Sequence, residues 1–333
     1  MHRTAPLFAL ALACLCPAAN AATFTMHQIT VQGSTSVDAT ALNDHGDFVG
    51  TVVLGGVNQI GFEQSGSTFT ALQGPCGVGT CQAYPTAINN AGTITGLAFG
   101  AEAGGFIWQN GGFVAGDFFS TGNSSSLTGG PWLNNRGEIA YNVVSSMGEQ
   151  IFAGLPGHTQ LQSGIGLAAN SSILTGLNDA GVLTGITLIT NRGAAAFAGR
   201  RGIFADLPVS VASGTPSVVI NDHNVLAGST GTGIWIYANN TQTTVPGPAQ
   251  SANLTVAGIN SAGRIVGAFT DQGAGVQRAF LYSHGVLSSF GSYPEGDTVH
   301  VAINHAGRML ISDVQAHSFT GTSYLALCRG TGC

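Results

Sequence analysis

Residues 258–267, GINSAGRIVG, decide the fold because close relatives of this stretch recur six more times in the chain. Leucine or isoleucine precedes the asparagine of each copy, and another apolar residue follows it five positions later. A spacing of 39–46 residues between copies predicts a repeat architecture in which each copy is one structural unit. The indexing asparagines are Asn43, Asn89, Asn134, Asn178, Asn221, Asn260 and Asn304.

The third residue after each asparagine identifies the kind of turn. Six copies have glycine there, and the fifth has Asn224. Asparagine is a poor substitute where glycine makes room for a phosphate, but it is the next-best residue where the backbone has a positive φ. Each copy is therefore predicted to be a β-hairpin, with the leading Asn side chain folded onto the turn backbone. A phosphate loop would also need a helix after the glycines, and RIVGAF (264–269) does not begin one.

Two further strands complete each unit. A short apolar segment forms the fourth strand in the first six units, so each unit has the four strands of a β-propeller blade. An aromatic residue marks the third strand, and it is expected to pack between neighbouring sheets, with a ligand-stacking platform as the alternative. These aromatic residues are Phe62, Phe106, Phe152, Phe197, Trp235, Phe280 and Tyr324.

The two ends of the chain are expected to close the ring. The seventh unit has no fourth segment, whereas residues 23–33, TFTMHQITVQG, have the pattern of one. The sequence thus predicts one all-β domain over residues 22–333, a seven-bladed β-propeller whose N-terminal strand completes the last blade. Closure removes exposed sheet edges. The alternative is an open β-solenoid, which would need a cap at each end.

Residues 1–21 are expected to be a signal peptide cleaved after Ala21, because an apolar run follows one basic residue and ends in small residues. A lipoprotein signal centred on Cys14 is the alternative. We therefore expect a secreted or periplasmic protein with no membrane span. We also expect a monomer. The chain has no lysine, and its scattered arginines make a nucleic-acid partner unexpected.

The repeated pattern [LI]-N-x-x-G-x-[apolar]-x-G, followed by a small-aromatic-apolar triplet, resembles the HAF-type extracellular repeat family of bacteria. Residues 259–291 follow it most closely, and the resemblance covers nearly all of residues 22–333. It implies a secreted or surface protein without an assigned enzymatic activity, and it supplies no ligand. The His that gives the family its name is replaced in every copy, by Ile60, Gly104, Gln150, Ala195, Gly233, Arg278 and Thr322.

Four cysteines follow the leader, in CGVGTC (76–81) and CRGTGC (328–333). An even number of cysteines in an exported chain predicts disulfides. The simplest pairing is local, Cys76 with Cys81 and Cys328 with Cys333. Crossed pairing remains open because the first and last blades are neighbours in a ring, and a four-thiolate zinc site is a further alternative.

No cofactor, catalytic residue or metal site is predicted. His300, His305 and His317 could hold a metal with Asp313, but His305 occupies a turn position and is expected to point to solvent. The turn aspartates offer too few oxygens for calcium. Arg200 and Arg201, at a hairpin bend, are interpreted as a solvated pair.

The variable loops on the face opposite the INxxG turns are the predicted functional surface, because a rigid ring presents binding groups on such loops. We expect a non-catalytic binding or scaffold module for glycans or other cell-envelope components. The alternative is a propeller-type hydrolase or lyase with an axial active site, in which ionisable groups would converge near the axis. The polar residues predicted to bind ligand are Glu149, Arg192, Asp271, Arg278, Asp313 and His317.

Overall fold

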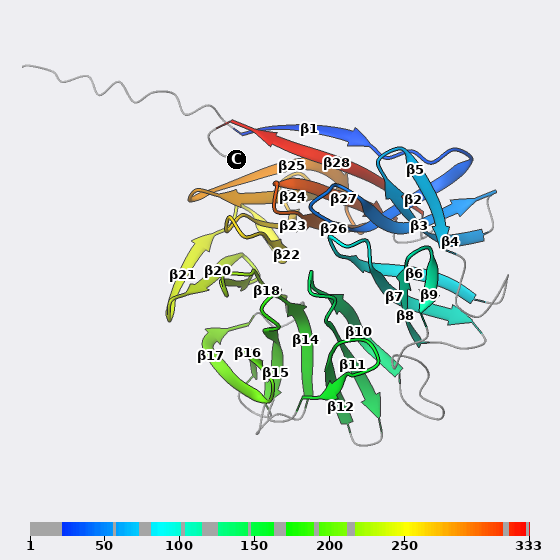
Figure 1. Cartoon of the computed structure of the whole chain (residues 1–333). Coiled ribbons are helices and arrows are strands. Elements are labelled where there is room, and N and C mark those ends of the chain that lie inside the picture. Colours follow the sequence, from blue (N-terminus) through cyan, green and yellow to red (C-terminus); the bar gives the residue numbers. More distant parts are fainter. Residues whose placement is uncertain are drawn as a thin grey trace, which may run out of the picture.

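A computed structural model describes residues 22–55, 58–72, 81–100, 104–114, 126–145, 148–162, 171–189, 193–211, 217–315, 320–330 and 333. These residues form seven antiparallel sheets of four strands each. The sheets are arranged around a central axis as the blades of a β-propeller (Figure 1). The described ranges include no helix long and apolar enough to cross a membrane.

Each blade is numbered by its place in the chain, and its strands run from the innermost to the outermost. Blade one consists of β2 (Ser34–Leu42), β3 (Phe48–Leu54), β4 (Asn58–Ser65) and β5 (Thr68–Leu72). Blade two consists of β6 (Cys81–Ile88), β7 (Ile94–Gly100), β8 (Gly104–Gln109) and β9 (Gly112–Val114). Blade three consists of β10 (Ser126–Leu133), β11 (Ile139–Ser145), β12 (Gly148–Gly154) and β13 (Gln160–Leu161).

The remaining four blades follow the same order, except that the first strand of the chain is the outermost strand of blade seven. Blade four consists of β14 (Ser171–Leu177), β15 (Leu183–Ile189), β16 (Gly193–Arg200) and β17 (Ile203–Ser210), and blade five of β18 (Val218–Ile220), β19 (Leu226–Ser229), β20 (Gly233–Ala238) and β21 (Thr241–Pro246). Blade six consists of β22 (Ser251–Ile259), β23 (Ile265–Asp271), β24 (Val276–Ser283) and β25 (Val286–Pro294). Blade seven consists of β26 (Thr298–Ile303), β27 (Arg308–Val314), β28 (Gly321–Arg329) and β1 (Thr23–Gln28).

The INxxG stretches form the turns between the first and second strands of the blades. The third residue after each asparagine has a positive φ, 60° at Asn224 and 74–90° at the glycines, as the sequence predicts. In the third turn, the Oδ1 atom of Asn134 accepts hydrogen bonds from the N–H groups of Arg136 (3.0 Å) and Glu138 (2.9 Å). The asparagine side chain therefore satisfies turn backbone that no strand pairs.

A glycine on the second strand lies opposite the aromatic residue of the third strand in five blades. In blade six, Gly267 lies opposite Phe280, and a Cβ atom on Gly267 would lie 2.7 Å from the Phe280 ring. The aromatic residues of these five blades are fully buried. In blade three Tyr141 takes the glycine position, and Phe152 stacks on it at 5.5 Å and is only partly buried. The aromatic residues are therefore packing residues, as expected.

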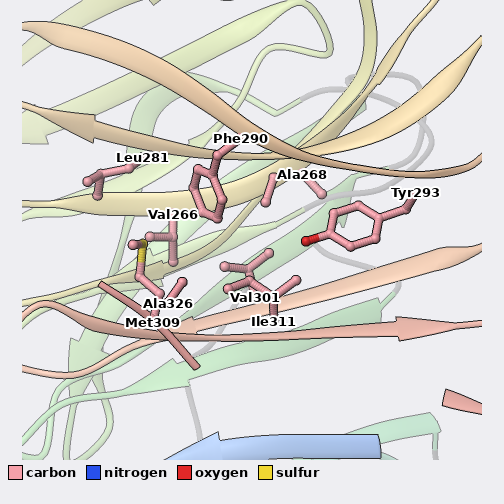
Figure 2. Packing of buried hydrophobic residues seen from close by; sticks show 10 residues of the cluster. Val266, Ala268, Leu281, Phe290, Tyr293, Val301, Met309, Ile311 and Ala326 are labelled. Atoms are coloured by element: carbon pink, nitrogen blue, oxygen red, sulfur yellow. The ribbon is translucent and has the colours of Figure 1, made fainter. Parts of the chain in front are cut away.

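The core lies between the blades. The buried apolar side chains group into seven clusters, and each cluster joins two neighbouring blades. Figure 2 shows the cluster between blades six and seven, where Phe290 of β25 and Val266 of β23 lie over Val301 and Ile311 of blade seven. Since each blade buries one face on each neighbour, stability depends on closing the ring.

Blade seven joins the two ends of the described chain. Strand β1 pairs antiparallel with β28 over six residues, from Thr23 opposite Arg329 to Gln28 opposite Tyr324, and the two strands lie side by side in Figure 1. The Phe24 ring stacks on Phe290 of blade six at 4.1 Å. The N-terminal strand is thus the outer strand of the last blade, which is the arrangement expected from the sequence.

One predicted disulfide is present in the described residues. Cys328 and Cys333 are bonded at an S–S distance of 2.03 Å, which is the local pairing and excludes crossed pairing for these two. The hydroxyl of Ser283 donates to the carbonyl oxygen of Cys333 at 2.9 Å, which holds the C-terminus on blade six. The predicted partners Cys76 and Cys81 lie outside the described side chains, as does the leader.

Candidate functional site

The seven INxxG turns surround the axis on one face of the molecule, called here the turn face. The indexing asparagine of each blade donates from Nδ2 to the carbonyl oxygen of the equivalent asparagine in the next blade, at 2.9–3.2 Å. The seventh bond, from Asn304 to Asn43, returns to the first blade. These seven bonds make a closed hydrogen-bonded circuit, called here the asparagine ring.

An axial hollow of about 170 Å³ lies inside this ring. The residues after the indexing asparagines line it, and their polar groups bond to one another across blades. Asp179, for example, accepts from the N–H of Asn135 at 2.7 Å and from its side chain at 3.0 Å. Burial raises the pKa of Asp44, but hydrogen bonds from Asn90 and the N–H of His305 outweigh it and hold the pKa below its ordinary value. The residues that line the hollow therefore form an acidic ring whose polar groups are hydrogen-bonded to one another.

His305 belongs to this ring and is exposed, as its turn position predicts. Its Nδ1 atom lies 3.1 Å from Asp44 and its Nε2 atom lies 3.4 Å from Asp222, and its side chain is 45% exposed. The turn projects over the axis, so that His305 reaches two other blades. His300 instead faces Asp38, at 4.0 Å, and no three His, Cys, Asp or Glu side chains of the described residues are grouped as a metal site would require.

The residues predicted to bind ligand do not form one site in the described structure. Glu149 lies in blade three and accepts from Asn142 at 3.0 Å, whereas Asp271 and Arg278 lie in blade six and pair at 2.7 Å. They lie in strands rather than in loops, because the second and third strands extend to within a few residues of the hairpin bend. Arg192 and His317 lie outside the described residues.

Asp313, on β27 of blade seven, has an acidic neighbour. Burial, followed by the charge of Asp297 and a hydrogen bond with it, raises the pKa of Asp313 to about 6. Two carboxyl groups this close share a proton more readily than either ionises alone. By contrast, the hydrogen bond from Arg278 holds the pKa of Asp271 below its ordinary value.

Substitution Asp313→Asn is expected to stabilise the protein at pH 8 and to leave it unchanged at pH 4. The raised folded-state pKa means that the proton on Asp313 stabilises the fold below the unfolded pKa of 3.8 and that this contribution is lost as the pH rises through about 6. Since Asp313 is only partly buried, we expect about 1 kcal/mol at pH 8. Urea unfolding at both pH values measures it.

The matched variant Asp271→Asn carries the opposite sign. The lowered pKa of Asp271 stabilises the fold above pH 3.8, so this variant should lose stability at pH 8 and not at low pH. If Asp313→Asn also lowered the free energy of unfolding at pH 8, the assignment of a shared proton to Asp313 would be wrong.

A groove of about 420 Å³ opens on the turn face between blades three and four. The β12–β13 connection and β13 supply His158, Gln160 and Leu161, and the bend between β16 and β17 supplies Arg200 and Arg201. Strand β13, the outer strand of blade three, is two residues long and lies at the edge of this groove. It is called here the three–four groove.

The groove combines donors with exposed apolar groups. Arg200 donates from Nη1 to the carbonyl oxygen of Ala180 at 3.3 Å, and the Gln162 side chain donates to the carbonyl oxygen of Gln160 at 3.0 Å. Leu161 is 50% exposed, and Ile203, next to the groove, is 81% exposed. This site is not the one expected from the sequence, where Arg200 and Arg201 are interpreted as a solvated pair. The signal for it in the sequence is two adjacent arginines in a chain with few charges.

No protein-family model and no curated protein matches the chain. Solved structures do. A structure titled YCF48 bound to D1 peptide has a TM-score of 0.53 at 11% identity, covering 92% of this chain and 97% of that one. The fold is a β-propeller.

Other propellers are similar in the same way. Prolyl oligopeptidase B from Galerina marginata has a TM-score of 0.54 at 10% identity. The match covers 84% of this chain and 48% of that one, so this chain spans about half the length of that protein. A lectin from Aleuria aurantia in complex with a fucose-containing disaccharide has a TM-score of 0.44 at 11% identity, covering 81% of this propeller and 98% of that chain. At these identities the likeness is one of fold.

Proposed function

We propose that this propeller is a non-catalytic binding module for glycans of the cell envelope, and that the three–four groove is its binding site. The observation that carries the proposal is the composition of the groove lining: the amides of Gln160 and Gln162 and two guanidinium groups stand beside the exposed side chain of Leu161. Sugars offer hydroxyl groups to such donors and apolar C–H faces to such side chains. Binding sites are typically concave, with few polar groups among apolar ones.

The proposal includes export to the periplasm or beyond, and membership of the HAF-type repeat family. The disulfide between Cys328 and Cys333 supports export, because disulfides persist in oxidising compartments. The non-catalytic part is supported by the axial hollow, where the carboxylates of Asp44 and Asp179 accept hydrogen bonds from neighbouring turns.

A glycan array with the purified chain from residue 22 tests the proposal, followed by affinity measurements on the strongest ligand. The variant Gln160→Ala/Gln162→Ala should weaken binding at least tenfold, because the groove loses its amides without a change in net charge. The exposed Gln242 of blade five serves as control, and Gln242→Ala should bind normally.

Two results would contradict the proposal. If Asp271→Ala/Arg278→Ala abolished binding while the groove variant bound normally, the ligand would occupy the opposite face predicted from the sequence. If a bound oligosaccharide were cleaved during incubation, the protein would be an enzyme.

A further inference from the structure

The three–four groove carries an excess of positive charge in a chain whose formal net charge is −6. Arg200 and Arg201 lie in its wall, and Glu138 is the one carboxylate among the described residues that line it. Glu138 is already bonded, because it accepts from the Nδ2 atom of Asn134 at 2.7 Å. Within the described part of the chain, neither arginine makes an ion pair.

The arginines of the described ranges gather on the turn face. The exception is Arg278, which lies on the opposite face and is paired with Asp271 at 2.7 Å. The carboxylates Asp44, Asp179 and Asp222 lie around the axis, whereas the outer part of the turn face holds most of its arginines together with Asp47 and Glu138. The arginines that end at the turn face are Arg136, Arg200, Arg201, Arg264, Arg308 and Arg329.

We propose that the ligand of the groove is an acidic saccharide, one whose sugar units carry a carboxylate, as hexuronic acids do. This inference rests on the proposed function. The planar guanidinium forks of Arg200 and Arg201 match the two oxygens of a carboxylate, and such charge-assisted bonds are stronger than those between neutral groups. The amides of Gln160 and Gln162 then hold hydroxyl groups, and Leu161 packs against the sugar ring.

Calorimetric titration with short oligomers of glucuronic, galacturonic, mannuronic and guluronic acid tests the inference, each compared with its methyl ester. At about 0.1 M salt, at least one free acid should bind tenfold or more tightly than its ester. Arg200→Ala/Arg201→Ala should remove this preference while leaving the weaker binding of the ester. Arg201→Lys should keep only part of it, because lysine retains the charge and not the fork.

Arg136→Ala is the matched control. Arg201→Ala should lose part of the preference, whereas Arg136→Ala removes the same single charge from the same face, outside the groove lining, and should leave the preference intact. Thermal unfolding followed by circular dichroism checks that every variant is folded. Equal loss in Arg136→Ala and Arg201→Ala would overturn the inference, because the acid would then be held by the general charge of the face.

The remaining outcomes separate the two proposals. If every acid bound no better than its ester, the acidic ligand would be wrong and glycan binding would stand. If sulfated or phosphorylated oligosaccharides bound more tightly than the uronic acids, the carboxylate assignment would be overturned. Failure of every acidic and neutral oligosaccharide to bind would overturn the proposed function itself.

Discussion

A chain that lacks residues 22–28 is expected to lose its cooperative unfolding transition and to aggregate. Strand β1 pairs with β28 at six positions, and Phe24 stacks on Phe290 of blade six at 4.1 Å. Its removal exposes the edge of β28 and opens the cluster that joins blades six and seven. An unpaired edge is a template for aggregation, and several kcal/mol of lost burial is a large share of a typical stability of about 5–15 kcal/mol. Circular dichroism melting and size-exclusion chromatography measure the effect.

Single substitutions in β1 are expected to destabilise the protein less than removal of the strand. Phe24→Ala should lower the free energy of unfolding by about 2 kcal/mol, since the ring is partly buried against blade six. The side chain of Thr25 points to solvent, so Thr25→Ala should change stability by less than about 0.5 kcal/mol. A truncated chain that melted at the temperature of the full chain would show that β1 does not close the ring.

The second large effect is expected at the asparagine ring, where Asn134→Ala should destabilise the protein by about 3–4 kcal/mol. The Asn134 side chain is 3% exposed, donates to Glu138 (2.7 Å) and to the carbonyl oxygen of Asn178 (2.9 Å), and accepts from two turn N–H groups. Alanine would leave buried backbone groups of two blades unpaired, at about 1–3 kcal/mol each before relaxation. Urea unfolding measures the loss.

The next residue in the chain provides the control for this prediction. Asn135 is exposed, and among the described residues its side chain bonds only to Asp179 (3.0 Å) and to the N–H of Asn90 (2.8 Å). Water can replace both bonds, so Asn135→Ala should cost about 1 kcal/mol or less. If the two variants lost stability equally, the buried inter-blade bond of Asn134 would contribute no more to stability than the exposed bonds of Asn135.

The fold could be predicted from the sequence because each structural requirement recurs seven times. Asn224 stands where the other copies have glycine, and its φ of 60° confirms that the position needs a left-handed backbone and not an absent side chain. Of the expected fourth strand at residues 158–164, the structure describes residues 158–162, and within these the strand is Gln160–Leu161. A composition rich in strand-forming residues cannot reveal how much of a segment finds a partner, since that depends on tertiary packing.

The candidate site could not be predicted because it depends on which parts of two blades meet. His158 and Arg200 are 42 positions apart in the chain, and only the ring places them in one groove. Variable loops directed the prediction to the opposite face, where Arg278 and Asp271 neutralise each other. His305 is exposed as expected, but its approach to Asp44 and Asp222 could not be predicted, because a turn pattern gives the local conformation and not its orientation toward the axis.

The one-way order of the asparagine ring has a consequence for connectivity. Each side-chain amide points to the next blade in the same rotational sense, and the last points to the first. No blade is therefore structurally the beginning, and Thr23 already lies opposite Arg329. A circular permutant that joins these ends through a short linker and opens the chain between two other blades would keep every bond of the circuit, so it can reach the same native topology from a new starting point.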